Sequence, residues 1–218
     1  MEKFEVENGV LKSYNGDCKI VIIPDGITKI DKNVFHEKGI EEVIIPNTVV
    51  EIADFAFGKN RLSQVTIPES VRIIGDFAFY ENEIRYLYIK EGTTKIGDYA
   101  FCSNKIIQLT LPDTLEEIGK NAFNMNKLRK LILPENVRVI RENAFSINDL
   151  ESVIFSKKTE KIENKAFIYN NINSCIIPAE EVQIDYDAFD YYTKEKIKIK
   201  KKIDEQLKVM YSNNRGDV

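Results

Sequence analysis

Histidine, cysteine and tryptophan are scarce in this chain of 218 residues, which contains one His, three Cys and no Trp. Catalytic triads and most zinc sites require a histidine with partners, and the single histidine, His36, has no such partner nearby in the sequence. We therefore expect His36 to be a surface turn residue. No phosphate-binding loop, dinucleotide-binding glycine pattern or Cys-x-x-Cys motif is present. The sequence predicts no catalytic residue, no metal site, no cofactor and no small-molecule substrate.

Long apolar runs are also missing. No stretch approaches the roughly 20 apolar residues that a bilayer span requires, and residues 1–7 lack the apolar segment of a signal peptide. Three cysteines are too few for a disulfide framework, which fits a reducing compartment. Cys18 and Cys175 are expected in the core and Cys102 is expected to be partly exposed. We expect a cytoplasmic protein without membrane contact, or a cell-surface protein if the sequence is a mature fragment.

The chain does contain a repeating pattern with a period of 22 residues. Eight of its 12 phenylalanines share one phase: Phe35, Phe57, Phe79, Phe101, Phe123, Phe145, Phe167 and Phe189. An isoleucine precedes each of them at a constant spacing: Ile30, Ile52, Ile74, Ile96, Ile118, Ile140, Ile162 and Ile184. All six prolines share a third phase: Pro24, Pro46, Pro68, Pro112, Pro134 and Pro178. A fixed period of this length is typical of leucine-rich repeats.

One repeat is too small to fold alone. Residues 62–67 end in alternating apolar and polar side chains and are closed by Pro68, which predicts a short strand. Ala78 and Phe79 are expected to form a single turn of 3₁₀ type. The few apolar positions of one repeat cannot offset an ordering cost of roughly 1.5 kcal/mol per residue, so stacking must stabilise it. The chain is therefore predicted to be one elongated repeat solenoid, with a parallel β-sheet of about nine strands on one face.

Two polar positions recur with the same period. Six repeats carry Asn three residues after Phe, whereas the first carries Lys38: Asn60, Asn82, Asn104, Asn126, Asn148 and Asn170. We expect these amides to bond backbone groups in a ladder at the start of the strands, and an amide-lined ligand groove is the alternative. Asp54, Asp76 and Asp98 are expected to cap the Ala-Phe turns. Calcium binding is the alternative for this acidic row.

The ends of the stack depart from the repeat. Residues 1–17 contain Asn8-Gly9 between apolar alternations, which predicts an N-terminal β-hairpin cap. Residues 18–200 hold eight 22-residue repeats and a terminal strand, Glu195–Lys200, whose lysines suit an edge. Residues 201–218 are expected to form a capping helix, Lys202–Tyr211, and a tail.

The segment from Ile74-Gly75 through Ala78-Phe79 to Ile89 resembles the BspA-like (Treponema-type) leucine-rich repeats. Their hallmark is an Ile-Gly…Ala-Phe stretch followed by Leu-x-x-Val-x-Ile-Pro, and the resemblance covers about residues 18–200. It implies a right-handed solenoid with a parallel sheet on one face and short turns on the other. It also implies a role in binding or adhesion, since many relatives are surface proteins.

A partner surface is expected on the outward rows of the sheet. The candidate residues are Gln64, Thr66, Tyr86, Tyr88, Gln108, Thr110, Lys130 and Ile132. They are interpreted either as a binding surface with tyrosine anchors or as residues chosen for strand propensity. The aromatic trio Phe55, Phe77 and Tyr99 is a second candidate surface, or it packs neighbouring turns together. We expect a monomeric, non-enzymatic module that binds a protein partner, with surface adhesion as the alternative function.

Nucleic acid is not expected as a partner. An acidic row follows the proline phase along the stack: Asp25, Glu69, Glu91, Asp113 and Glu135. Like charges on the phosphate backbone would oppose binding along this row.

Overall fold

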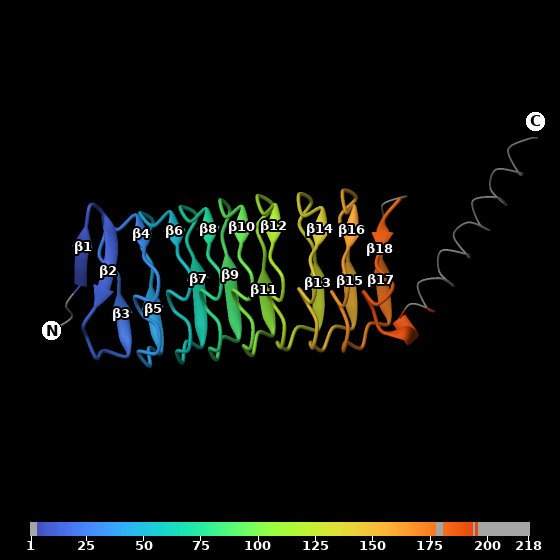
Figure 1. Cartoon of the computed structure of the whole chain (residues 1–218), viewed down its shortest axis with the longest axis horizontal. Helices are drawn as coiled ribbons and strands as arrows, with labels where there is room; N and C mark the ends of the chain where they lie inside the picture. The colour runs from blue at the N-terminus through green and yellow to red at the C-terminus, as the bar shows by residue number, and fades with distance from the viewer. Residues whose placement is uncertain (1–3, 178–180, 194, 196–218) are drawn as a thin grey trace, which may run out of the picture.

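The chain winds into an elongated solenoid whose coils lie side by side along one axis (Figure 1). The structure, a computed structural model, describes residues 4–177, 181–193 and 195. The N-terminal cap is the predicted hairpin, in which β1 (Phe4–Glu7) pairs antiparallel with β2 (Val10–Tyr14). Asn8 and Gly9 have φ angles of 51° and 77°, the left-handed conformation that this tight turn requires.

One strand per coil forms the face that the alternating pattern predicts, which we call the front sheet. Its strands are β3 (Ile20–Ile22), β5 (Glu42–Ile44), β7 (Gln64–Ile67), β9 (Tyr86–Ile89), β11 (Gln108–Thr110), β13 (Lys130–Ile132), β15 (Ser152–Ile154) and β17 (Ser174–Ile176). Paired strands are parallel and shifted by one repeat, so that Gln64 lies beside Tyr86 and Tyr86 beside Gln108. Residues that are one repeat apart in the sequence are therefore paired with each other in the sheet.

A second row of parallel strands, which we call the short ladder, was not expected from the sequence. After β2 it contains β4 (Lys29–Ile30), β6 (Glu51–Ile52), β8 (Ile73–Ile74), β10 (Lys95–Ile96), β12 (Glu117–Ile118), β14 (Val139–Ile140), β16 (Lys161–Ile162) and β18 (Gln183–Ile184). Each of these later strands has two residues and ends at the periodic isoleucine. Two residues are too few to show alternation in the sequence, which is why the pattern predicted a single sheet.

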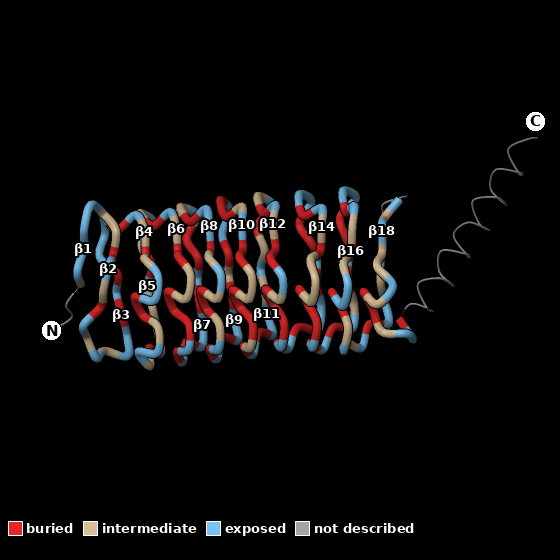
Figure 2. Tube along the Cα trace, viewed as in Figure 1, coloured by how far each residue is buried: buried red, intermediate tan, exposed pale blue. Residues whose placement is uncertain are grey.

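The core between the two rows is built from periodic side chains stacked on their own copies. The eight periodic phenylalanines are buried, and consecutive rings lie nearly parallel at 4.9–5.7 Å between centroids. Figure 2 shows buried positions recurring in every coil. The Ala-Phe segments are pairs of successive turns rather than 3₁₀ helix. In one of them Ala56 N donates to Ala53 O and Gly58 N donates to Phe55 O. Phe55, which the two turns share, has a left-handed φ of 56°, and this breaks the regular helical conformation.

One joint of the stack differs from the others, and we call it the seam. In the described part of the chain the front sheet is interrupted between β5 and β7 and between β11 and β13. The short ladder is interrupted once, between β12 and β14. Both rows therefore open together at the seam, where Figure 1 shows a wider interval between the ribbons. The turn side stays joined, because Phe123 N donates to Ala144 O at 2.9 Å.

The C-terminal part of the stack is described only to residue 195. Residues 191–193 and 195 are helical, so the first residue of the predicted strand Glu195–Lys200 is in helical conformation. The other residues of that strand, the predicted helix Lys202–Tyr211 and the rest of the cap 201–218 lie outside the described residues. Within the described ranges, no helix has the length and apolar character of a bilayer span.

Candidate protein-binding surface

The outer face of the front sheet carries all eight candidate residues. Strand alternation turns Val65 and Ile67 into the core and leaves Gln64 and Thr66 exposed. The same alternation exposes the other candidates, except Tyr88, which is half-buried. The sequence therefore predicted the orientation of these side chains correctly, because one core position in each strand sets the facing of its neighbours.

Apolar side chains dominate the row of this face that contains Thr66 and Tyr88. Five of its isoleucines are 41–69% exposed: Ile22, Ile44, Ile132, Ile154 and Ile176. Tyr86, which is 37% exposed, adds a ring at the middle of the face. The isoleucines lie on both sides of a central stretch formed by Thr66, Tyr88 and Thr110. Exposed apolar side chains gathered on one face commonly mark an interaction site. Tyrosine also combines a large apolar contact area with a hydroxyl, which suits the centre of an interface.

The seam brings four of the candidates together around one groove. Gln108 and Thr110 of β11 form one wall, and Lys130 and Ile132 of β13 form the other. The groove has a volume of about 530 Å³. It could not be inferred from the repeat, because the repeat predicts the same pairing at every joint. The sequence does contain one signal of this difference. Leucine occupies all four inward positions in β11, β13 and the residue that follows each of them. Every other front strand has at least one β-branched residue or cysteine at its inward positions.

The remaining four candidates do not join that groove. Gln64 and Thr66 line a second groove of about 690 Å³, at the interruption between β5 and β7. Tyr86 and Tyr88 lie on β9, which is paired with a strand on each side. The candidate surface thus consists of a closed tyrosine-bearing centre flanked by two openings in the sheet.

Charges of opposite sign mark the two ends of the seam groove. Arg129 and Lys130 line it where β13 begins. Asp113 and Glu135 line it beyond the ends of the two strands. A ligand that follows the strand direction would therefore meet cations at one end and carboxylates at the other.

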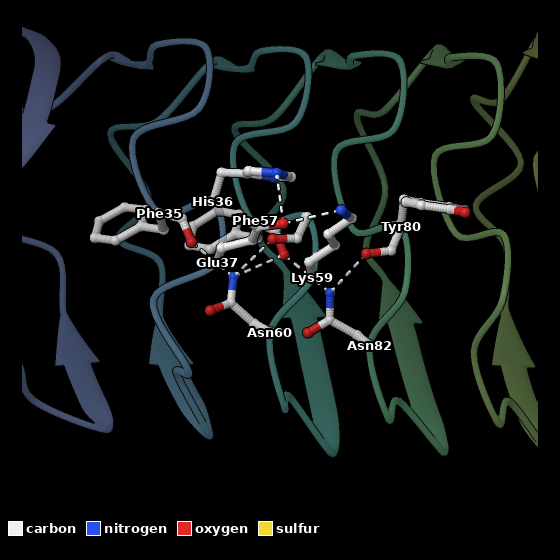
Figure 3. Close-up of polar contacts among 9 residues, drawn as sticks. Phe35, His36, Glu37, Phe57, Lys59, Asn60, Tyr80 and Asn82 are labelled. Carbon is white, nitrogen blue, oxygen red and sulfur yellow. Dashed lines mark hydrogen bonds and ion pairs between the residues drawn. The ribbon is translucent and has the colours of Figure 1, made fainter.

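The asparagine ladder on the turn side is structural rather than a ligand groove. Asn60 Oδ1 accepts a hydrogen bond from Ile40 N at 3.0 Å. Its Nδ2 donates to Phe35 O at 2.7 Å and to Phe57 O at 2.9 Å, and Asn82 repeats the arrangement one coil later (Figure 3). Both ends of each amide are thus occupied by backbone groups of two coils, which confirms the expected backbone-bonding ladder.

The aspartate row also joins coils. Asp54 Oδ1 accepts a hydrogen bond from Asp76 N at 3.1 Å, and Asp76 Oδ1 accepts one from Asp98 N at 2.8 Å. Each carboxylate therefore caps an Ala-Phe turn, and the turn that it caps belongs to the next coil. The same contact explains the Ile-Gly pattern, because a Cβ added to Gly75 would lie 2.6 Å from Asp54 Oδ1. Among the described residues, no group of three or more His, Cys, Asp or Glu side chains is placed to hold a metal ion.

The second candidate surface is engaged in packing within the fold. Phe55, Phe77 and Tyr99 stack at 4.6 and 4.7 Å between centroids, with their ring planes within 3°. Their ring faces are therefore used between neighbouring coils, which favours the packing interpretation. His36 lies at a turn, as expected, but it is partly buried rather than a surface residue, and its ring meets Phe55 edge-on.

Cys102 is the clearest error among the predicted exposures. It was expected to be partly exposed, but only 4% of it is accessible, and burial raises the pKa of its thiol. Its Sγ lies 3.6 Å from Asn124 Oδ1 of the next coil, so the covering group belongs to a neighbour. Cys18 and Cys175 were expected in the core and are only partly buried.

Comparison with known proteins identifies a family and a fold. The chain matches the family described as BspA type Leucine rich repeat region in 6 copies, over residues 12–126 and 72–198. The T. pallidum leucine-rich repeat protein TpLRR is similar in structure, with a TM-score of 0.56 and 18% identity over 90% of this chain and 92% of that chain. The pneumococcal vaccine antigen PcpA is similar with a TM-score of 0.54 and 21% identity over 76% of this chain. The match spans about half of the PcpA chain, 50%. No curated protein is significantly similar in sequence.

Proposed function

The chain belongs to the BspA-type leucine-rich repeat family, and on that premise we propose that it is a non-enzymatic module that binds a protein partner on the front sheet. Solenoids of this kind present extended, rigid surfaces, because each repeat contacts only its neighbours and leaves one face free. A preformed surface reduces the ordering cost of association. We further propose that the module acts as a monomer and takes neither nucleic acid nor a small-molecule substrate.

The observation that carries the proposal is the row of exposed isoleucines on the front sheet, which contains Tyr88 and has Tyr86 in the row beside it. Most polar groups that recur in the repeat are engaged between coils, as the asparagine ladder and the aspartate row illustrate. One outward row of the front sheet instead carries exposed isoleucines on five coils. Exposed apolar surface of this extent is stabilised when a partner covers it.

Replacing Tyr86 and Tyr88 together with alanine tests the proposal. The double variant is expected to lose capture of the partner in affinity purification from cells of the source organism, followed by mass spectrometry. Far-UV circular dichroism should stay unchanged, because both rings lie on the outer face. Tyr169→Ala is the matched control, since Tyr169 is 67% exposed but lies outside the front sheet. If the double variant captures the same partner as the wild type, the front-sheet proposal is wrong.

Surface adhesion or host interaction is the second candidate function. It is supported by the structural similarity to a protein described as a pneumococcal vaccine antigen. Fractionation of the native cells, combined with protease treatment of intact cells, separates the two settings. Protein found on the outside and cleaved there would favour adhesion, whereas protein confined to the cytosol would favour an internal partner.

A further inference from the structure

At the seam, two strand edges face each other without pairing. In the described part of the chain, β11 has a strand partner only at β9, and β13 has one only at β15. Their facing edges therefore present the backbone N–H and C=O groups that normally join neighbouring strands. An extended peptide backbone supplies donors and acceptors at the spacing that such edges require.

The floor of the seam groove is apolar and incompletely covered. Leu109 and Leu111 point inward like their equivalents in the preceding coil, Leu87 and Ile89. Those equivalents are fully buried, whereas Leu109 and Leu111 are only partly buried. The missing cover is the side chain of a neighbouring strand, so an inserted segment with apolar residues at alternate positions would complete the core at this level.

The two coils that form the groove are joined by contacts on their other sides. Phe123 N bonds Ala144 O on the turn side. Behind the front sheet, Arg141 Nη2 meets Glu117 Oε1 at 2.9 Å across the interrupted short ladder. The two walls thus belong to one continuous stack. The groove between them is confined to the strands themselves, because Lys127 N donates to Ile106 O at 3.0 Å before the strands begin and Asn136 Nδ2 donates to Asp113 O at 2.9 Å beyond their ends.

From these observations we propose that the seam groove binds one extended segment of the protein partner, which adds as a β-strand between β11 and β13. The segment carries an acidic residue at the end beside Arg129 and Lys130 and a basic residue at the end beside Asp113 and Glu135. The charges at the two ends of the groove set this pattern, and the apolar floor selects alternating apolar side chains between them. The inference rests on the proposed function, for which it specifies the chemistry of the ligand.

A labelled peptide tests the groove directly. The probe is the fluorescein-labelled heptapeptide Asp-Val-Thr-Val-Thr-Val-Lys, measured by fluorescence anisotropy against the full chain. Saturable binding is expected, together with slower hydrogen exchange at the backbone of residues 108–111 and 129–133. The analogue with N-methyl groups at alternate residues should not bind, because it cannot pair with a strand edge. No saturable binding, or equal binding of the N-methylated analogue, would overturn the proposal.

Charge variants locate the binding. Arg129→Glu combined with Lys130→Glu is expected to weaken heptapeptide binding by about tenfold or more, since two cations are replaced by anions. Arg85→Glu is the matched control, because Arg85 holds the same repeat position as Arg129 beside β9, which is paired on both sides. Equal weakening by both variants would place the peptide elsewhere. Concentration-dependent dimerisation that the heptapeptide reverses would assign the groove to a second copy and overturn the proposal.

The outcome separates this inference from the proposed function. If Tyr86→Ala with Tyr88→Ala abolishes partner capture while the heptapeptide does not bind, the front sheet is the interface and the groove inference is wrong. If the double variant keeps partner capture and the heptapeptide does not bind, both are wrong. If the double variant loses the partner, and the heptapeptide binds the groove and competes with the captured partner, both stand.

Discussion

Removing one amide from the asparagine ladder should cost far more than an ordinary asparagine substitution. Asn126 is 1% exposed, and its Oδ1 accepts the only hydrogen bond given by the buried Ile106 N, at 3.0 Å. Its Nδ2 donates to Phe101 O at 2.9 Å and to Phe123 O at 3.2 Å. Asn126→Ala removes all of these contacts at once.

The size of the effect follows from which groups keep a partner. Phe101 O and Phe123 O each retain a second amide donor, from Asn104 and Asn148, so each carbonyl loses only the net contribution of a hydrogen bond. Ile106 N loses its single acceptor and stays buried, which costs about 1–3 kcal/mol. With roughly 0.5–1.5 kcal/mol for each of the two carbonyls, the free energy of unfolding should fall by about 2–6 kcal/mol.

Urea unfolding followed by far-UV circular dichroism measures this loss. The midpoint should fall for Asn126→Ala, and a simultaneous fall in the m-value would show that the stack divides at this coil. Asn136→Ala is the control, because the exposed Asn136 also donates to a backbone carbonyl, Asp113 O at 2.9 Å. Its effect should stay within about 0.5 kcal/mol. Equal effects of the two variants would refute the reasoning, since burial would then not matter.

A second test replaces the donor end of the same amide with a carboxylate. Asn126→Asp keeps an acceptor for Ile106 N but turns an anionic oxygen toward Phe101 O and Phe123 O. The folded state would therefore favour the protonated acid and raise its pKa above the unfolded value. The loss of stability should be smaller at pH 4 than at pH 8, because the stabilisation is present below the unfolded pKa and is lost as the pH rises. A loss independent of pH would show that the carbonyls do not face this side chain.

Two further predictions concern close packing between coils. Gly97→Ala should lower the free energy of unfolding by about 2 kcal/mol, because the new Cβ would lie 2.7 Å from Asp76 N; Ala53→Gly, at the same repeat position, should cost no more than about 1 kcal/mol, and equal losses would contradict the explanation. Cys102 should react with a disulfide reagent more slowly than Cys18 and Cys175 at pH 8, with all three equal in urea. Because burial raises the pKa of the Cys102 thiol, its contribution to stability should be complete below the ordinary value of 9.0 and decline at higher pH, a decline that Cys102→Ala should reduce.

The sequence predicted the stack well because each periodic side chain meets its own copy in the next coil. Phe123, for example, stacks on Phe101 and Phe145, so any of the three positions must suit the same neighbour. That requirement makes the repeat visible as identity at a fixed spacing. The inward and outward facing of the front strands follows from the same positions, which is why the candidate residues were placed on the correct face.

Features that depend on differences between coils were not predictable in the same way. Cys102 is covered because Asn124 lies over it, and in the two preceding coils the position of Cys102 holds Gly58 and Tyr80. When the residue at a repeat position changes from coil to coil, the repeat does not indicate which side chain will lie over it. The short ladder was missed for another reason. After β2, each of its strands has only two residues and ends at the periodic isoleucine, so no alternating pattern of side chains marks it in the sequence.

The seam shows how a repeat protein can form a distinct site from nearly identical parts. The stability of a stack is close to a sum of terms between neighbouring coils, so a joint without either ladder contributes less than the joints around it. The turn side, with Phe123 N bonded to Ala144 O, keeps the two halves in one stack. Partly buried Leu109 and Leu111 and unpaired strand edges therefore persist in a folded protein. A strand bound there would supply the hydrogen bonds and apolar contacts that strand pairing gives at the other joints. The groove is therefore complementary to an extended strand of the kind found in the repeat itself.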